Sequence, residues 1–382
     1  MKQRKILLFA NTDWYLYNFR RSLAEKLRSQ GWEVVLVSPP GEYGPKMQAL
    51  GFRWIPFDFS TRSINPFNEL AVIYRLIRIY RSERPSLAHH FTIKCVLYGS
   101  MAARFAGKFP VVNSVTGLGH IFTDSGKKAR ILRPLINLLY RFVFGNHNGR
   151  VIFQNSQDLN SFVTSGIVRK SRARLIRGSG VNTELFRPSF SDSQKERDIV
   201  SVLFASRILR EKGVFEFLEA AQILKDHGVK SHFMLAGDIY PGNPSSLSDD
   251  EIAKIKHEGF VNYLGHVDNM MNLLSDSDIV VLPSYREGTP RILIEAAAME
   301  KPIVATDIAG CVGIVEHGVN GLLVPVNDTR SLAKAIEKLI MDPELRIKLG
   351  KAGREIVISE FDENIVLKKT LAVYEELTGE EQ

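Results

Sequence analysis

The sequence predicts an α/β protein built from two doubly wound, Rossmann-like domains. Its 382 residues exceed the size at which one hydrophobic core normally suffices, so two domains are expected. Two parts of the chain also begin alike, each with an apolar strand, a helix and a second strand: residues 5–11, 19–30 and 33–38, and residues 200–206, 214–227 and 232–236. This repeated order is typical of parallel sheets covered by helices.

The remaining elements continue the same alternation. Short apolar runs predict further strands at residues 111–114, 151–154, 279–282, 303–306 and 322–324. The polar stretch at residues 187–197 has the composition of a linker, and it separates an N-terminal domain, residues 1–187, from a C-terminal domain that begins at residue 188. Apolar spacing over residues 361–377 predicts a final helix.

Composition argues against several classes of protein. No apolar run reaches about 18 residues, so no transmembrane helix is expected. The first apolar run is too short for a signal peptide and lacks a cleavage site. The two cysteines, Cys95 and Cys311, argue against a disulfide framework and favour a cytosolic protein. The glycine pattern of dinucleotide-binding proteins follows neither first strand, which argues against an NAD-dependent enzyme.

Charge is divided unevenly along the chain. Residues 1–190 contain 29 Lys and Arg against 10 Asp and Glu, whereas residues 191–382 contain 21 against 32, so the net charges are +19 and −11. This asymmetry indicates that the N-terminal half meets an anionic partner, such as a membrane surface, nucleic acid or a phosphorylated acceptor. No recognisable nucleic-acid-binding motif accompanies it, so a nucleic-acid partner is not expected.

Two predicted helices in the basic half, residues 68–84 and residues 127–144, carry cations beside apolar side chains. Basic heads above apolar stems suit a helix that lies on anionic lipid. The alternative is that the apolar faces are core and the cations merely solvated. For the first helix both interpretations stay open, whereas for the second the membrane interpretation is favoured. The cations expected at the membrane are Lys127, Lys128, Arg130 and Arg133.

The most informative segment carries Glu287 and Glu295 on either side of a predicted strand-to-helix junction. Thr289 is a good N-cap and Pro290 suits the first helical position, so free backbone N–H groups and the positive end of the helix dipole are expected there. Such an end suits an anionic ligand, and the two acids suit hydroxyl groups, which together predict a nucleotide sugar. The alternative is a solvated surface on which Arg291 and Glu295 form an ordinary i,i+4 pair.

Two cations follow the first strand of the second domain. Arg207 closes this strand and Lys212 precedes a helix, so both are expected over the carboxyl ends of the same sheet as the two glutamates. Two cations there can bind a diphosphate and neutralise the charge that develops on a departing nucleoside diphosphate. The alternative is a pair of surface cations in a loop.

An ordered set of motifs places these residues in a family. It comprises Arg207 with Lys212-Gly213, Ala236-Gly237-Asp238, Leu264-Gly265-His266-Val267, Leu282-Pro283-Ser284, residues 286–295, Ala305-Thr306-Asp307 and residues 318–325. Over about residues 200–330 this set resembles retaining glycosyltransferase family 4, whose GT-B fold has two Rossmann-like domains facing across a cleft. Residues 90–94, 98–100 and 115–119 resemble a subgroup that extends lipid-linked bacterial surface glycans.

The resemblance implies roles for the matching residues. Arg207 and Lys212 would bind the donor diphosphate. Glu287 would face the transferred sugar, and Glu295 would bind the ribose hydroxyls. Further donor contacts are implied for Gly237, His266, Val267, Gly288, Thr289, Pro290 and Arg291. Acceptor contacts are implied for Asn11, Asp13, Lys94, Thr116 and Gly117. Many family members have a catalytic-face histidine where this chain has Thr116, and His120 is the candidate replacement.

The resemblance also implies an activity. The enzyme would move a hexose or N-acetylhexosamine from a nucleotide diphosphate sugar, preferably a UDP-sugar, with retention at the anomeric carbon and without metal or cofactor. The acceptor would be a polyprenyl-diphosphate-linked saccharide at the inner face of the cell membrane. The C-terminal helix, about residues 361–382, would return to the N-terminal domain and leave residues 188–360 as the donor domain. Two alternatives are an epimerase or hydrolase of the same fold and an inactive membrane-docked scaffold, although the four charged donor-site residues argue against a scaffold.

Two further motifs are expected to be structural. Asp276-Ser277-Asp278 matches the DxD pattern of metal-dependent enzymes of another fold, but it precedes a buried strand on the side away from the expected site. His89 and His90 could suggest a metal site, but no third ligand has suitable spacing.

Overall fold

The computed structural model describes residues 4–60, 65–116, 138–145, 148–188, 199–240 and 243–379. The chain divides into unit 1, which contains Met1–Ser179 and Val366–Gln382, and unit 2, which contains Gly180–Ile365. The predicted boundaries, after residue 187 and at about residue 361, differ from these by eight and about five residues. The C-terminal segment therefore belongs to the same unit as the N-terminal sheet.

Unit 1 is built on a seven-stranded parallel sheet in the order β3-β2-β1-β4-β5-β6-β7. Its strands are β1 (Lys5–Phe9), β2 (Glu33–Ser38), β3 (Arg53–Pro56), β4 (Leu87–Phe91), β5 (Val111–Val115), β6 (Gly149–Phe153) and β7 (Ala173–Leu175). The strands β1 and β2 are apolar along almost their whole length and buried on both faces, as parallel strands between two helical layers must be.

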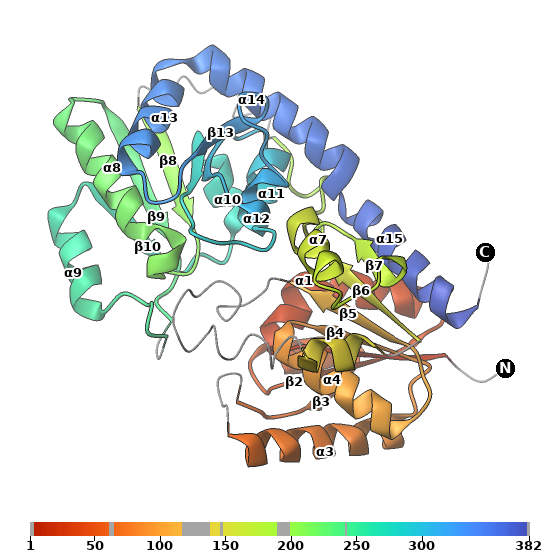
Figure 1. Ribbon diagram of the computed structural model, residues 1–382. Helices are drawn as coiled ribbons and strands as arrows, with labels where there is room; N and C mark the ends of the chain where they lie inside the picture. Colours follow the sequence, from red (N-terminus) through yellow and green to blue (C-terminus); the bar gives the residue numbers. More distant parts are fainter. Residues whose placement is uncertain are drawn as a thin grey trace. The chain divides into compact units, whose positions relative to one another are not determined.

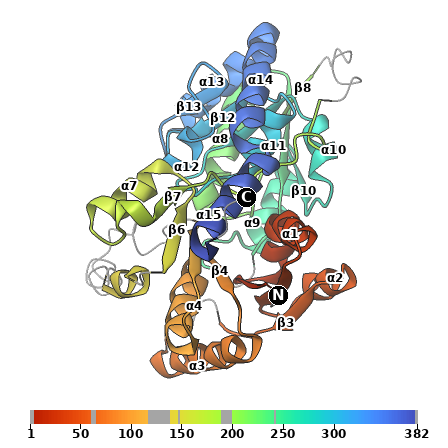
Figure 2. The same cartoon turned by 90° about the vertical axis from the view of Figure 1, so that its right-hand side faces the viewer.

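Alternate side chains of these strands contribute to two core layers, one on each face of the sheet. Helices of unit 1 cover both faces (Figure 1 and Figure 2). Ile6 and Leu8 of β1 belong to the layer that contains α1 (Asp13–Ser29), α2 (Tyr43–Ala49) and α15 (Glu363–Thr378). Leu7 and Phe9 belong to the layer that contains α3 (Pro66–Glu83) and α4 (Ile93–Ala106). Helical residues 138–144 and α7 (Ser156–Thr164) extend the second layer over β5 and β6.

The helix α1 begins six residues before the predicted start at residue 19. Thr12 caps it, because its hydroxyl accepts a hydrogen bond from the backbone N–H of Tyr15 at 3.1 Å. The aromatic residues that follow have modest helix propensity, which concealed this start. Tertiary packing therefore extended the helix beyond its obvious apolar periodicity.

Unit 2 is built on a six-stranded parallel sheet in the order β10-β9-β8-β11-β12-β13. Its strands are β8 (Val200–Ala205), β9 (Ser231–Ala236), β10 (Val261–Gly265), β11 (Ile279–Leu282), β12 (Ile303–Thr306) and β13 (Gly321–Val324). Every strand predicted in this half is present, and β10 completes the sheet. The prediction of two Rossmann-like α/β domains is confirmed.

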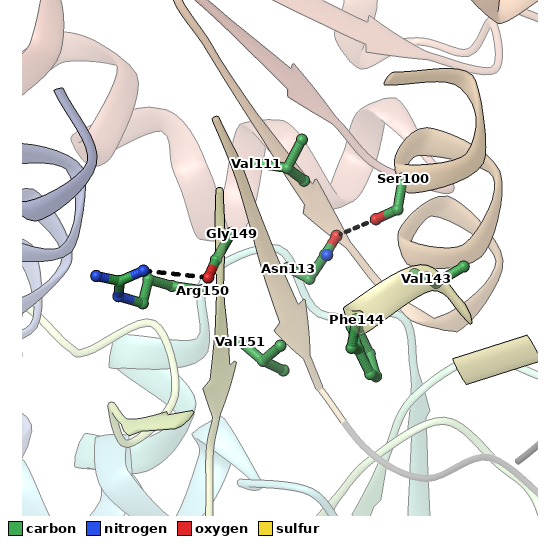
Figure 3. A pocket seen from close by; sticks show the side chains of 8 residues that line it. All are labelled: Ser100, Val111, Asn113, Val143, Phe144, Gly149, Arg150 and Val151. Atoms are coloured by element: carbon green, nitrogen blue, oxygen red, sulfur yellow. Dashed lines mark hydrogen bonds between the residues drawn. The ribbon is translucent and has the colours of Figure 1, made fainter. Parts of the chain in front are cut away.

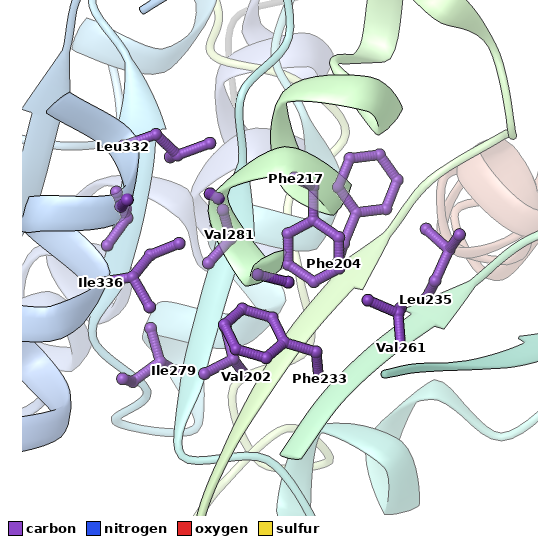
Figure 4. Close-up of a cluster of buried hydrophobic side chains, with 14 of the residues drawn as sticks. Val202, Phe204, Phe217, Phe233, Leu235, Val261, Ile279, Val281, Leu332 and Ile336 are labelled. Atoms are coloured by element: carbon purple, nitrogen blue, oxygen red, sulfur yellow. The ribbon is translucent and has the colours of Figure 1, made fainter. Parts of the chain in front are cut away.

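Helices cover both faces of this second sheet as well. One face carries α8 (Val214–Asp226), α9 (Asp249–Glu258) and α13 (Thr329–Met341), packed around the apolar cluster of Figure 4. Leu349 of α14 (Pro343–Ile356) joins this layer. The other face carries α10 (Met270–Ser275), α11 (Arg291–Ala298), α12 (Ala309–Val312) and the π-helical turn at Val357–Phe361.

Candidate active site

The sheet of unit 2 has a switch point between β8 and β11. These strands are neighbours, but the chain leaves β8 toward β9 on one side and leaves β11 toward β12 on the other. In open parallel sheets, ligands bind at the carboxyl ends of the strands that flank such a reversal. Arg207 and Lys212 follow β8, and the loop at residues 283–290 follows β11. The topology thus brings two sequence-distant charged segments to one sheet edge.

Lys212 and Glu287 form the central contact of this edge. The Lys212 Nζ atom donates to Glu287 Oε1 at 2.5 Å, and their side chains are only 13% and 12% exposed. The same carboxylate oxygen accepts a hydrogen bond from the Ser284 hydroxyl at 2.8 Å. The carbonyl of Ser284 in turn accepts a hydrogen bond from the hydroxyl of Thr306, at the end of β12. Charge-assisted contacts from two segments therefore hold the Glu287 carboxylate in place.

Two glycines make the close approach of these segments possible. Gly213 follows the 3₁₀ turn Arg210–Lys212 and has φ of +78°, which is costly for any other residue. A Cβ atom there would lie 2.2 Å from the carbonyl oxygen of Pro283. A Cβ atom at Gly310, in α12, would lie 2.5 Å from the carbonyl oxygen of Glu287. Small residues on both sides therefore let the Glu287 loop pack between neighbouring turns.

The helix α11 begins one residue later than predicted. Pro290, with φ of −71° and ψ of 110°, occupies the N-cap position and makes no side-chain capping bond, so the assignment of Thr289 as N-cap is wrong. The extended ψ of Pro290 places the first helical residue at Arg291. Gly288 and Thr289 belong to the loop before the helix and are partly buried.

Arg291 and Glu295 form the anticipated i,i+4 pair, with the Arg291 Nε atom 2.7 Å from Glu295 Oε1. The pair is not a solvated surface pair, because Glu295 is buried. Burial raises the pKa of the Glu295 carboxyl, and the charge and hydrogen bond of Arg291 act in the opposite direction. The ion pair with Arg291 thus stabilises the buried carboxylate of Glu295 near the start of α11.

Arg207 makes contacts of a different kind from those of Lys212. Its guanidinium group is exposed, lies over the ring of Tyr240 at 5.7 Å from the centroid, and forms no ion pair among the residues that the structure describes. His266, also exposed, contacts Asp238 at 3.0 Å and Asp268 at 3.2 Å. These residues line the carboxyl ends of β8, β9 and β10.

Gly237 and Val267 belong to the same edge. A Cβ atom at Gly237 would lie 1.7 Å from the carbonyl oxygen of Ser206, so glycine alone fits there. Its own carbonyl accepts a hydrogen bond from the Tyr263 hydroxyl at 3.0 Å. Val267 is partly buried against the apolar cluster that contains α10 and α11.

Acceptor residues were predicted in unit 1, and two of them have contacts within the protein. Asp13 is buried, and its carboxylate accepts hydrogen bonds from the backbone N–H groups of Trp14, Tyr43 and Gly44 at 2.7 to 2.9 Å. It therefore stabilises the start of α2. Lys94 donates to the carbonyl of Ser60 at 3.0 Å and pairs with Glu69 at 3.3 Å.

The other acceptor candidates are less constrained. Asn11 and Thr116 are partly buried at the ends of β1 and β5. The remaining predicted residues lie outside the described residues: Gly117, His120, Lys127, Lys128, Arg130 and Arg133.

The two adjacent histidines of β4 are core residues. His89 is hydrogen-bonded to the hydroxyl of Tyr374 at 2.5 Å and to that of Ser114 at 2.7 Å. Burial lowers the pKa of His89 well below its usual value. His90 makes equivalent contacts with Tyr80 and Asn113, each at 2.8 Å, and burial lowers its pKa to about 4. Both rings are therefore neutral and fully hydrogen-bonded.

The Asp276-Ser277-Asp278 motif lies at the amino ends of the strands, as predicted. The Asp278 carboxylate accepts a hydrogen bond from the backbone N–H of Ser201, at the start of β8, at 2.8 Å. Across the described parts of the chain, no three His, Cys, Asp or Glu side chains are grouped so that they could hold a metal ion. In the same residues, no helix combines the length and apolar character needed to cross a bilayer.

A small cavity in unit 1 is a packing gap. Its volume is about 10 Å³, roughly one water molecule, and it lies between β5, β6 and helical residues 138–144 (Figure 3). Its lining residues are Ser100, Val111, Asn113, Val143, Phe144, Gly149, Arg150 and Val151. It is too small for a sugar or nucleotide.

Sequence reasoning missed the residues that support Glu287. Ser284 and Thr306 were noted only as parts of short motifs, and Tyr285 was given no role. Their contacts join segments that are distant in the chain, such as Ser284 and Thr306, 22 residues apart. A polar residue directly after a buried strand was the one available signal.

Comparison with known proteins gives consistent findings. A family model described as "Glycosyl transferases group 1" matches residues 187–356, and one described as "Glycosyl transferase 4-like" matches residues 5–155. The N,N'-diacetylbacillosaminyl-diphospho-undecaprenol alpha-1,3-N-acetylgalactosaminyltransferase of Campylobacter jejuni is 32% identical over 370 residues, which cover 94% of this chain and 95% of that protein.

Two further proteins extend this comparison. The UDP-Gal:alpha-D-GlcNAc-diphosphoundecaprenol alpha-1,3-galactosyltransferase of Escherichia coli is 24% identical over 79% of this chain and 78% of its own. The structure of sucrose-phosphate synthase from Thermosynechococcus elongatus matches with a TM-score of 0.80 and 22% identity, covering 98% of this chain and 100% of that one. This structural match concerns the fold alone.

Proposed function

This chain belongs to the group 1 glycosyltransferases and has the GT-B fold, and on that premise we propose that the switch point of unit 2 is its donor site. The Lys212–Glu287 pair carries this proposal, because it places a cation and an acid together where a parallel sheet binds ligands. A nucleotide sugar offers groups for both, namely a diphosphate for the cation and sugar hydroxyls for the acid. The donor is a UDP-sugar.

The donor diphosphate binds to Lys212, Arg207 and the amino end of α11. The Lys212 ammonium has three N–H groups, so two remain for phosphate oxygens while one contacts Glu287. The exposed guanidinium of Arg207 supplies a second cation. Glu295, buried beside the start of α11, binds the ribose hydroxyls. Gly237, His266 and Val267 lie beside the base.

Transfer proceeds on one face of the sugar and retains the anomeric configuration. The acceptor hydroxyl oxygen bonds to the anomeric carbon while the bond from this carbon to the diphosphate oxygen breaks. The hydroxyl proton passes to the departing diphosphate, which serves as the base. Lys212 and Arg207 neutralise the charge that develops on this leaving group, so the reaction needs no metal ion.

The acceptor is a lipid-linked saccharide at the inner face of the cell membrane, used in surface glycan synthesis. The names of the Campylobacter jejuni and Escherichia coli relatives both describe transfer to a sugar on diphospho-undecaprenol. The transferred sugar is a hexose or an N-acetylhexosamine, as in those names. Unit 1, the basic part of the chain, provides the surface that meets the membrane.

The outward face of α3 supports this membrane location. Phe67, Leu70 and Tyr74 are 81%, 61% and 62% exposed. Because they are spaced three and four residues apart on the helix, they form one continuous apolar stripe. Arg78 and Arg81 continue the same exposed face toward the end of the helix. The inward face packs on the sheet through Val72, Leu76 and Tyr80. An exposed apolar stripe followed by cations suits an anionic bilayer surface.

The activity is tested by incubating the protein with a panel of UDP-sugars and a lipid extract, with mass spectrometry of the products. We expect one hexose or N-acetylhexosamine to be added to a polyprenyl-diphosphate saccharide, with EDTA present or absent. Free UDP with an unchanged acceptor would instead indicate a hydrolase, and loss of transfer in EDTA would contradict metal independence.

Membrane docking is tested by co-sedimentation with liposomes that contain anionic lipid. Phe67→Ser with Leu70→Ser should weaken binding roughly tenfold for each side chain removed from the interface, and charge reversal of Lys127, Lys128, Arg130 and Arg133 should also weaken it. The matched control is Met341→Ser, because Met341 is 72% exposed on α13 of the acidic unit 2. Equal binding to neutral liposomes, or equal loss in the control, would contradict the proposal.

A further inference from the structure

The loop at residues 283–290 is joined to α8 by a tyrosine that no donor contact requires. The Tyr285 hydroxyl donates a hydrogen bond to Glu216 Oε1 and lies 3.4 Å from the side-chain oxygen of Asn327, which follows β13. Its backbone N–H donates to the carbonyl of Glu211 at 2.9 Å. Tyr285 therefore connects the loop that carries Glu287 to the first turn of α8 by its side chain, and to the 3₁₀ turn Arg210–Lys212 by its backbone.

Glu216 is an unusual acid for its surroundings. It is only 8% exposed, and its second carboxylate oxygen, Oε2, is buried and finds no hydrogen-bond partner among the described residues. A buried carboxylate oxygen without a partner costs free energy, so packing alone would favour an uncharged residue here. Glu216 is the third residue of α8, where the helix dipole favours a negative charge, and this interaction offsets part of the cost.

The directed contact of this acid is the hydroxyl of Tyr285. Burial, together with the hydrogen bond and charge of Glu216, raises the pKa of Tyr285 to about 12. The phenol thus remains protonated at neutral pH and acts as the donor. A phenol that donates to a carboxylate makes a stronger hydrogen bond than one that donates to a neutral group. The charge of Glu216 therefore strengthens the bond that holds Tyr285.

Movement of Tyr285 would be transmitted directly to the proposed donor site. Ser284, the preceding residue, donates to Glu287 Oε1 and is itself bound by Thr306. Glu287 follows two residues after Tyr285 and contacts Lys212. The loop is thus fixed at the Ser284 end by β12 and at its outer edge by α8, so releasing the outer edge alters the approach of Glu287 to Lys212.

We propose that Glu216 and Tyr285 are positioning residues for glycosyl transfer, which hold the β11–α11 loop so that Glu287 meets Lys212 in the reactive geometry. Neither residue needs to touch the substrate. The inference rests on the proposed function of the Lys212–Glu287 site. It adds to that function a support that lies outside the donor contacts, on the first turn of α8.

Steady-state transfer kinetics of Tyr285→Phe and Glu216→Gln test the proposal, with UDP-sugar varied at saturating acceptor. We expect kcat to fall by about ten- to a hundred-fold while KM for the donor changes little, because misplacement of a reacting group affects the transition state most. The double variant should lose no more than Tyr285→Phe alone, because both changes remove one hydrogen bond. Tyr285→Phe should also add little to the loss already caused by Glu287→Gln.

Glu219→Gln is the matched control, because Glu219 lies one turn further along α8 and its carboxylate accepts from Thr329, away from the loop. It should retain the wild-type kcat. Wild-type kcat in Tyr285→Phe, or losses that multiply in the double variants, would overturn the inference, as would an activity loss fully explained by a lower melting temperature. Absence of transfer by the wild-type protein would instead contradict the proposed function itself.

Discussion

Each of the two sheets of this protein has its own switch point, and the polar residues around the two points have different roles. In unit 1 the reversal lies between β1 and β4, where Asp13, His89 and His90 are buried and hydrogen-bonded within the protein. In unit 2 the reversal lies between β8 and β11, where Lys212 and Glu287 form an ion pair with spare N–H groups on the lysine.

The difference lies in how far each polar group is satisfied by the fold. The Asp13 carboxylate already accepts three backbone N–H groups, and both nitrogens of each histidine have partners. Such groups stabilise the core and have little capacity left for a ligand. The same topology therefore yields structural polar residues in the described part of one unit and a candidate ligand site in the other.

The largest expected effect concerns the ion pair of unit 2. Lys212→Ala should lower kcat by about 10²- to 10³-fold, the usual cost of removing one group that stabilises developing charge. Arg210→Ala is the control, because Arg210 lies in the same 3₁₀ turn but pairs with Glu251 at the surface. The measurement is kcat for sugar transfer by the two variants. Full activity of Lys212→Ala, or an equal loss in Arg210→Ala, would contradict the functional difference between the units.

The next effect concerns the close approach that creates the pair. Gly213→Ala should lower the free energy of unfolding by roughly 3 kcal/mol or more, because the new Cβ atom collides with the backbone of Pro283. Gly228→Ala also has a positive φ, of 76°, but has nothing within 4 Å, so it should cost only about 1 kcal/mol. Urea unfolding followed by far-UV circular dichroism compares them, and equal losses would show that backbone strain alone matters at Gly213.

The smallest effect concerns the histidines of unit 1. Burial lowers the pKa of His90 to about 4 and that of His89 well below 6.5. The unfolded state therefore binds protons below pH 6.5 that the folded state does not, and stability falls as the pH falls. Between pH 6.5 and 5.5, His90 should remove about 1 kcal/mol from the stability of unit 1, and His89 should add to the loss in the same direction.

Tryptophan fluorescence can follow this loss selectively. The three tryptophans of the chain, Trp14, Trp32 and Trp54, all belong to unit 1. The unfolding midpoint in urea should decrease over this pH interval, which lies above the main titration range of carboxylates. A midpoint that stays constant would mean that the histidines are not kept neutral by burial, and the contrast between the two switch points would weaken.

The candidate site was only partly predictable from the sequence. The alternation of apolar runs and helices predicted two parallel sheets, but it did not predict the strands β3, β4 and β7 of unit 1 or β10 of unit 2. The polar residues after β8 and β11 pointed to the edge that carries Lys212 and Glu287. The start of α11 was misplaced by one residue, because Thr289 favours the N-cap and Pro290 the first helical position, and only the extended ψ of Pro290 shows that the helix begins after it. The support from Ser284, Thr306 and Tyr285 was invisible, because no local pattern reports which distant side chain a hydroxyl will meet.

The sequence by itself determined the number of units, their α/β class, the order of motifs and hence the family, because these depend on local periodicity and composition. Tertiary structure alone decided that Lys212 meets Glu287 across 75 residues, that Asp13 stabilises the start of α2, and that the apolar stripe of α3 remains exposed. The physical reason is that a local pattern specifies a strand, helix or cap, whereas the partner of a charged or apolar side chain depends on how distant segments pack.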